Sequence, residues 1–256
     1  MNTHQTFPDS VRWRTLGVAS TGRGHAFSGE PCQDHHKMAS LLNGDLVVIV
    51  ADGAGSAEYS DEGARVASET CLALIAEQSH ARPLSEQDYQ KIFVATARSV
   101  ANYARSFQLS PRDFATTLNV LHVTQHGTYN ASIGDSGCLI QTDTNELKLL
   151  AEPFKGRYAN ETAFLSRRMV EKYFSFGSTT EAIKGFIAAT DGIFDLLYQQ
   201  DRINVESASA LIECLRKQDP LRAQQELETF FQSQTLARFT RDDLTLVVGH
   251  STTKGC

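Results

Sequence analysis

Apolar and polar positions divide the chain into strand-like and helix-like segments. Residues 46–51, LVVIVA, carry only apolar side chains, a pattern typical of a strand covered on both faces. Further strands are predicted at 13–20, 116–124, 129–134, 138–142, 186–190 and 244–250. Two links between predicted strands are short, residues 125–128 and residues 135–137. Short links between consecutive strands favour antiparallel pairing.

Helical spacing appears between these strands. Ser60 is a predicted N-cap for a helix whose apolar stripe runs through Ala64, Ala67, Cys71, Leu74 and Ile75. Ser85 and Asp88 resemble a capping box before the next helix, and two more helices are predicted at 206–217 and 221–236. The separate groups of strands and helices predict an α+β fold in which helices pack on sheets.

Composition narrows the class of protein. The chain has 256 residues, of which 41% are hydrophobic and 21% charged, and its net charge is −6. These values, without repeats or a linker, predict a single globular domain over residues 1–256. The chain has no run of basic residues that would indicate nucleic-acid binding. It also has no segment of the roughly 18 apolar residues that would span a bilayer.

The same features predict where the protein works. The first 15 residues lack the pattern of a secretory signal, and the five cysteines are scattered, odd in number and without CxxC spacing. We therefore expect a cytoplasmic monomer without disulfide bonds or a zinc site.

An aspartate follows the most apolar strand directly. Asp52 comes after residues 46–51, and Gly53 follows it. An unpaired carboxylate at the tip of a buried strand is costly to desolvate. Asp52 therefore lies either in a solvated turn, which Asp-Gly also favours, or beside a positive charge.

Other aspartates repeat this position. Asp135 and Asp191 follow predicted strands, Asp242 and Asp243 precede one, and Asp34 lies upstream. No lysine accompanies them within these motifs, so a cluster of them needs another source of positive charge. Oxygen ligands without sulfur or imidazole favour Mg²⁺ or Mn²⁺, and the spacing is too wide for an EF-hand loop.

The ordered motifs resemble a known family. They are Gln33-Asp34, Ala51-Asp52-Gly53, Thr116-Thr117-Leu118, Gly134-Asp135-Ser136, Thr190-Asp191-Gly192 and Asp242-Asp243-Leu244-Thr245. Together, over residues 15–249, they resemble the PP2C-type metal-dependent protein serine/threonine phosphatases, in particular a bacterial branch. The resemblance implies a β-sandwich of two antiparallel sheets flanked by helices. It also implies a phosphorylated protein as substrate and a water activated by two metal ions, with a more weakly held third.

The resemblance also assigns roles. Asp52 would bridge both metals, the carbonyl of Gly53 would bind one, and Asp191 and Asp242 would bind the other. Asp34 would act through water, and Asp135 would serve the third metal. Asp52, Asp191 and Asp242 are thus the expected catalytic residues. Asp242 is preferred over Asp243, because many relatives have Asn at the second position.

Three positions depart from the family pattern. Gly29 stands where many relatives have a phosphate-binding arginine, so Arg23 or His25 is the candidate replacement. Ala54 stands where some relatives have a histidine that acts as general acid, and Gly137 stands where an arginine often follows the GDS motif. These departures leave open a second interpretation, a catalytically weak or inactive PP2C-like binding module.

Two other motif matches are weaker. Residues 134–137, GDSG, imitate the nucleophile loop of trypsin-like proteases, but no histidine lies in that family's usual context. Gly22-Arg23-Gly24 lacks the third glycine of a nucleotide-binding loop. The irregular segment 153–168 is a plausible place for substrate choice, with Arg157, Asn160 and Glu161 as candidates.

Overall fold

Two antiparallel five-stranded sheets form the centre of the molecule. The computed structural model describes residues 12–154, 156, 162–234 and 236–252. One sheet has the order β1 (Trp13–Ser20), β12 (Leu244–Ser251), β9 (Ile183–Ala189), β6 (Gly137–Thr142) and β7 (Leu147–Leu149). The other has the order β2 (His35–Ser40), β3 (Leu46–Ala51), β4 (Leu118–Thr124), β5 (Gly127–Ile133) and β8 (Ser175–Thr179). A small two-stranded pair joins β10 (Tyr198–Gln199) and β11 (Arg202–Ile203).

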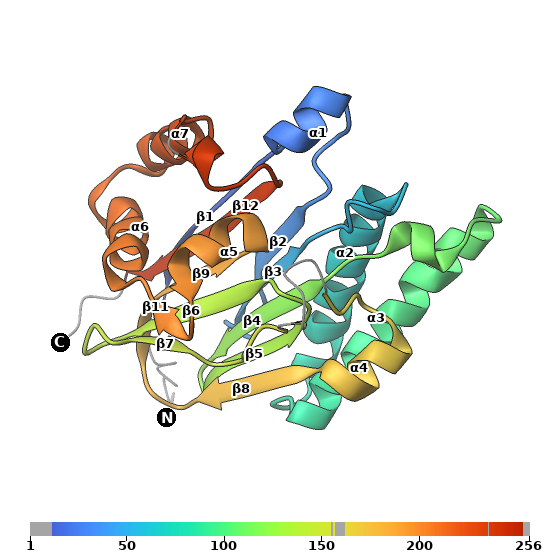
Figure 1. Cartoon of the computed structure of the whole chain (residues 1–256). Helices are drawn as coiled ribbons and strands as arrows, with labels where there is room; N and C mark the ends of the chain where they lie inside the picture. The colour runs from blue at the N-terminus through green and yellow to red at the C-terminus, as the bar shows by residue number, and fades with distance from the viewer. Residues whose placement is uncertain (1–11, 155, 157–161, 235, 253–256) are drawn as a thin grey trace, which may run out of the picture.

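Helices cover the outer faces of both sheets (Figure 1). On the β3 sheet lie α2 (Ser60–Ser79), α3 (Glu86–Ser106) and α4 (Arg167–Tyr173). On the β12 sheet lie α6 (Val205–Lys217) and α7 (Pro220–Phe231). Shorter elements are α1 (Arg23–Ser28), α5 (Asp191–Leu197), and the 3₁₀ turns η1 (Pro111–Phe114) and η2 (Leu236–Arg238). The predicted sandwich of two antiparallel sheets flanked by helices is confirmed.

Strand β3 shows why its sequence is apolar throughout. Val47, Ile49 and Ala51 pack in the core beneath α2 and α3. Leu46, Val48 and Val50 belong to the core between the two sheets. All six residues are buried, so every position of the strand contributes apolar area to one of two cores.

The helix starts follow the predicted caps in one of two cases. Ser85 and Asp88 form the capping box that opens α3. At α2 the prediction is wrong: Ser60 is already helical, and Tyr59 is the N-cap without a side-chain hydrogen bond. Ser60 is instead buried in the first turn, beside the backbone of Gly53.

Pairing between distant strands overrides some local predictions. Residues 125–126 close the hairpin of β4 and β5, but the link 134–136, only one residue longer, carries the chain from β5 in one sheet to β6 in the other. The sequence patterns also miss β2, β7 and β8, all of them edge strands. Edge strands bury less area and tolerate polar residues, as in His35-His36-Lys37 of β2, so their apolar pattern is weak.

Two further predictions concern the helices and the cysteines. In the part of the chain that the structure describes, no helix is long and apolar enough to span a bilayer. Cys32, Cys71, Cys138 and Cys214 are free thiols, and Cys256 lies outside the described residues.

Candidate metal centre

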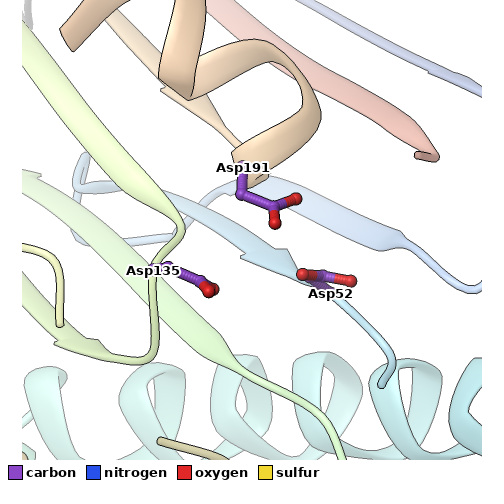
Figure 2. Close-up of side chains that lie close together, drawn as sticks. All are labelled: Asp52, Asp135 and Asp191. Atoms are coloured by element: carbon purple, nitrogen blue, oxygen red, sulfur yellow. The ribbon is translucent and has the colours of Figure 1, made fainter. Parts of the chain in front are cut away.

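Three aspartates from separate segments converge at one edge of the sandwich. Figure 2 shows Asp52 after β3, Asp135 in the link between β5 and β6, and Asp191 at the first turn of α5. One carboxylate oxygen from each lies within 4.8 Å of those of the other two. We call Asp52, Asp135 and Asp191 the acidic cluster. Oxygen ligands at this separation match the donor set of a hard divalent cation.

The backbone around Asp52 is fixed by neighbouring threonines. The Asp52 amide donates to the Thr117 hydroxyl at 3.0 Å, and the Thr116 hydroxyl donates to the Asp52 carbonyl at 3.0 Å. Gly53 has no room for a side chain, because a Cβ there would lie 2.7 Å from the carbonyl oxygens of Gln33 and Ser60. The sequence Asp52-Gly53 therefore serves close backbone packing at the end of a buried strand.

The acidic cluster is electrostatically unbalanced. Burial raises the pKa of Asp52 well above its ordinary value, and the charges of Asp34 and Asp191 raise it further. Burial, with the charges of Asp135 and Asp242, also raises the pKa of Asp191. Among the described residues, no lysine, arginine or histidine forms an ion pair with the cluster, and Oδ1 of Asp135 is buried without a hydrogen-bond partner. The site therefore fits a bound cation better than an internal partner.

Asp34 lies beside the cluster but is differently held. It is buried, and the Thr190 hydroxyl donates to its Oδ2 at 2.7 Å. Burial raises the pKa of Asp34, although the bond from Thr190 lowers it in part. Thr190 directly precedes Asp191. The turn after β9 therefore positions two carboxylates, that of Asp191 itself and, through the Thr190 hydroxyl, that of Asp34 before β2.

The structure separates the two aspartates that precede β12. Asp242 is exposed and lies outside the set of three, but its charge contributes to the raised pKa values of Asp52 and Asp191. Asp243 is buried, and its carboxylate accepts from the amides of Gly22 at 2.6 Å and Gln33 at 2.5 Å. The carboxylate of Asp243 thus accepts from two amides, whereas Oδ1 of Asp242 accepts from one, that of Asp243 itself at 3.0 Å.

The two candidate phosphate-binding residues lie on a short helix. Residues 23–28 form the short helix α1, and the amide of Gly24 donates to the carbonyl of Arg241 at 2.9 Å. His25 Nδ1 lies 3.0 Å from Oδ2 of Asp243, and Arg23 is exposed. Burial lowers the pKa of His25, but the bond to Asp243 and the nearby charges outweigh this and raise it.

Sequence reasoning missed the supporting residues of the site. Thr190 and Asp243 each occur inside a motif, but a motif does not reveal which backbone or side-chain atoms its residues hydrogen-bond in the fold. The only sequence signal was the acid at position 243 where relatives have Asn. Arg157, Asn160 and Glu161, proposed for substrate choice, lie outside the described residues.

Comparison with known proteins agrees with this geometry. The family model described as protein phosphatase 2C matches residues 21–232. A curated relative, serine/threonine-protein phosphatase 3 of Escherichia coli (strain K12), is 32% identical over 190 residues, which cover 72% of this chain and 74% of the relative.

Solved structures show the same fold at low identity. The serine/threonine phosphatase Stp1 from Staphylococcus aureus superposes with a TM-score of 0.65 at 12% identity, over 100% of both chains. RsbX, solved in complex with magnesium, superposes with a TM-score of 0.57 at 18% identity, over 94% of this chain and 96% of RsbX.

The family model, the curated relative and the two-sheet fold together define the class of protein as a phosphatase. The chain belongs to the protein phosphatase 2C family, the protein serine/threonine phosphatases that the order of its aspartate motifs already resembled.

Proposed function

We propose that this protein hydrolyses phosphoserine and phosphothreonine in proteins and requires Mg²⁺ or Mn²⁺ to do so. One observation carries the proposal. Three carboxylates from separate segments lie within 4.8 Å of one another, and no described cation is paired with them. Such repulsion is relieved either by protonation or by a bound cation, and a divalent cation relieves it while all three carboxylates stay charged near neutral pH.

The ligand set follows from the residues around the cluster. We propose that Asp52, Asp135 and Asp191 bind the metals directly, with Asp242 and the carbonyl of Gly53 completing the set and Asp34 acting through water. When bound, two such ions and a weaker third supply a nucleophilic water near neutral pH and charge that screens the phosphoryl oxygens.

The chain's own residues orient this site. Thr116 and Thr117 fix the backbone of Asp52, and Thr190 fixes the carboxylate of Asp34. A cysteine nucleophile is disfavoured, because burial and the charge of Asp34 raise the pKa of the nearby Cys32 thiol. Hydrolysis by activated water, without a phosphorylated enzyme, fits these environments best.

Arg23 and His25 are our proposal for the group that binds the phosphate. His25 lies beside the loop after Asp52, since a Cβ at Gly55 would lie 3.8 Å from its Nε2. Oδ2 of Asp243 lies 3.0 Å from Nδ1 of His25, and Nε2 lies on the side of that loop, 3.8 Å from Oε2 of Glu30. Arg23, two residues before His25 on α1, offers the planar fork suited to phosphate oxygens.

A small chromogenic phosphate ester tests the proposal directly. The purified protein should hydrolyse the ester and a phosphothreonine peptide with Mn²⁺ or Mg²⁺, should lose activity in EDTA, and should recover it when metal is restored. The same assay compares Asp52→Asn with Asp143→Asn, the matched control that removes a charge from an exposed position. Full turnover in metal-free buffer would refute the metal-dependent mechanism.

The same experiment separates the enzyme from an inactive binding module. A module that has lost catalysis would still bind Mn²⁺, detected as a rise in Tm, but would turn over neither substrate. The missing arginine at Gly29 is the feature that favours this second interpretation.

The remaining expectations concern partners and location. A phosphorylated protein is the substrate expected of this family. We propose that the protein acts in the cytoplasm, an assignment supported by the four free thiols at Cys32, Cys71, Cys138 and Cys214. The monomeric state and the absence of nucleic-acid or membrane partners stay predictions.

A further inference from the structure

A large groove lies next to the acidic cluster on the helical side of the molecule. Its volume is about 1160 Å³, and it is lined by α3, η1, α4 and the stretch 162–166. Figure 1 shows α3 and α4 side by side over the β3 sheet. The floor contains apolar and small side chains such as Val94, Ala101 and Met169.

The groove begins at the proposed catalytic site. Ser56, on its lining, follows Asp52 by four residues in the same loop. The carbonyl of Ala115, another lining residue, accepts from the Ala54 amide at 2.9 Å. The amide of Leu165, also on the lining, donates to the carbonyl of Thr116 at 2.7 Å, and the hydroxyl of Thr116 donates to the carbonyl of Asp52. A chain that leaves the site in this direction therefore enters the groove.

The lining has the opposite charge to the protein as a whole. The molecule carries a net charge of −6, yet the described lining contains five cations and one carboxylate, Glu171. Arg167 pairs with Glu171 at 2.8 Å. Among the described residues, no carboxylate forms an ion pair with the other four: Lys91, Arg98, Arg105 and Arg112.

Three of these cations form a regular row. Lys91, Arg98 and Arg105 are exposed residues of α3 at intervals of seven. Seven residues are almost two helical turns, so the three side chains share one face, about 10 Å apart along the axis. The opposite face of α3 is buried in the core through residues such as Tyr89 and Phe93.

We propose that this groove binds an acidic flank of the phosphoprotein substrate and so selects phosphoserine and phosphothreonine sites next to acidic residues. The inference rests on the proposed phosphatase function and adds a substrate class to it. An extended polyproline-II segment puts every third side chain on one face, about 9 Å apart, which matches the row on α3. Carboxylates at three-residue intervals are therefore the preferred pattern.

Matched phosphopeptides test this proposal. One carries glutamate at every third position on the N-terminal side of phosphothreonine, one carries the same pattern on the C-terminal side, and the reference has glutamine throughout. One acidic peptide should exceed the reference in kcat/KM by about ten-fold near 0.1 M salt, and the preference should shrink near 1 M salt.

Charge variants assign the preference to the groove. The triple variant Lys91→Gln, Arg98→Gln and Arg105→Gln should reduce the ratio of acidic to neutral kcat/KM to about one. The control Arg202→Gln, Arg222→Gln and Arg238→Gln removes the same charge from exposed positions outside the groove lining and should keep the wild-type ratio. Melting curves check that both triple variants are folded.

The outcomes separate this inference from the phosphatase function. Hydrolysis of the chromogenic ester with equal kcat/KM for all peptides would overturn the groove assignment alone. If the ester is not hydrolysed, fluorescence anisotropy with labelled, unphosphorylated glutamate and glutamine peptides still measures the charge preference. Loss of the preference in both triple variants would show a general charge effect. A wild-type dimer that the groove variant dissociates would assign the groove to self-association. Either result would overturn the proposal.

Discussion

Strand β3 has one aspartate at each end, and the two are held in opposite ways. Asp45, before the strand, accepts from Nδ2 of Asn43 at 2.8 Å and lies 3.1 Å from Nε2 of His122. The other imidazole nitrogen, Nδ1, lies 2.8 Å from the hydroxyl of Tyr89. This buried carboxylate has its partners within the chain.

Asp52, after the strand, has carboxylates as its neighbours instead. Both aspartates flank the same six apolar residues, so the strand itself does not decide their roles. We therefore expect Asp45 to contribute to stability, because side-chain donors meet it, and Asp52 to belong to the proposed metal site, because other carboxylates do. The predictions below test that contrast.

The largest expected effect is the loss of turnover in Asp52→Asn. Because one substitution removes a charge shared by the whole cluster, kcat/KM should fall by about 10²–10⁴-fold with saturating Mn²⁺, and Asp191→Asn should be nearly as severe. Steady-state kinetics with a phosphothreonine peptide measures this. Wild-type kinetics in Asp52→Asn would show that the assigned ligand role is wrong.

Asp45→Ala should affect stability rather than chemistry. It leaves His122 and Asn43 without their buried acceptor, so unfolding in urea should become easier by about 2–4 kcal/mol. The exposed Asp143→Ala is the matched control and should change stability by less than about 0.5 kcal/mol. An unchanged urea midpoint for Asp45→Ala would mean that the network contributes little.

Removing a charge from the acidic cluster, at the other end of β3, should instead stabilise the metal-free protein. In EDTA, Asp191→Asn should unfold at a Tm about 2–4 °C above wild type, because repulsion within the cluster is relieved. Added Mn²⁺ should then raise the Tm of wild type more than that of the variant. A lower Tm for the variant in EDTA would contradict the repulsion.

The pH dependence of the metal-free protein follows from the raised carboxyl pKa values. Burial and neighbouring charges raise the pKa of Asp191 to about 8, far above an unfolded aspartate near 4. The folded state therefore holds more protons in this window, and the free energy of unfolding should fall by up to about 1.4 kcal/mol per pH unit between pH 5 and pH 8. Urea unfolding in EDTA measures the slope, which should flatten in Asp191→Asn.

The smallest expected effect concerns the phosphate. Arg23→Ala or His25→Ala should raise KM a few-fold for the chromogenic ester, as expected for one lost charge-assisted hydrogen bond. A cationic His25 would make KM climb above its raised pKa, whereas binding by Arg23 would give no such rise. If neither variant changes KM or kcat, α1 does not contact the phosphate.

The sequence predicted the regular part of the fold and the identity of the acids. The continuous apolar runs of β3 and β12 and the capping box of α3 are local signals, and the structure keeps them. The edge strands β2, β7 and β8 could not be predicted in this way, because pairing with a neighbour stabilises them more than their own side chains do.

Only the tertiary structure decided what the aspartates meet. The motifs place an acid at each strand end, but the crossing from β5 to β6 between sheets is what brings Asp135 to within 4.8 Å of Asp52 and Asp191. Likewise, the seven-residue spacing of Lys91, Arg98 and Arg105 is readable in the sequence, but its place beside the acidic cluster is not. Local sequence patterns determine which residues a segment presents. The partner of a buried charge depends instead on distant segments of the chain that fold against it.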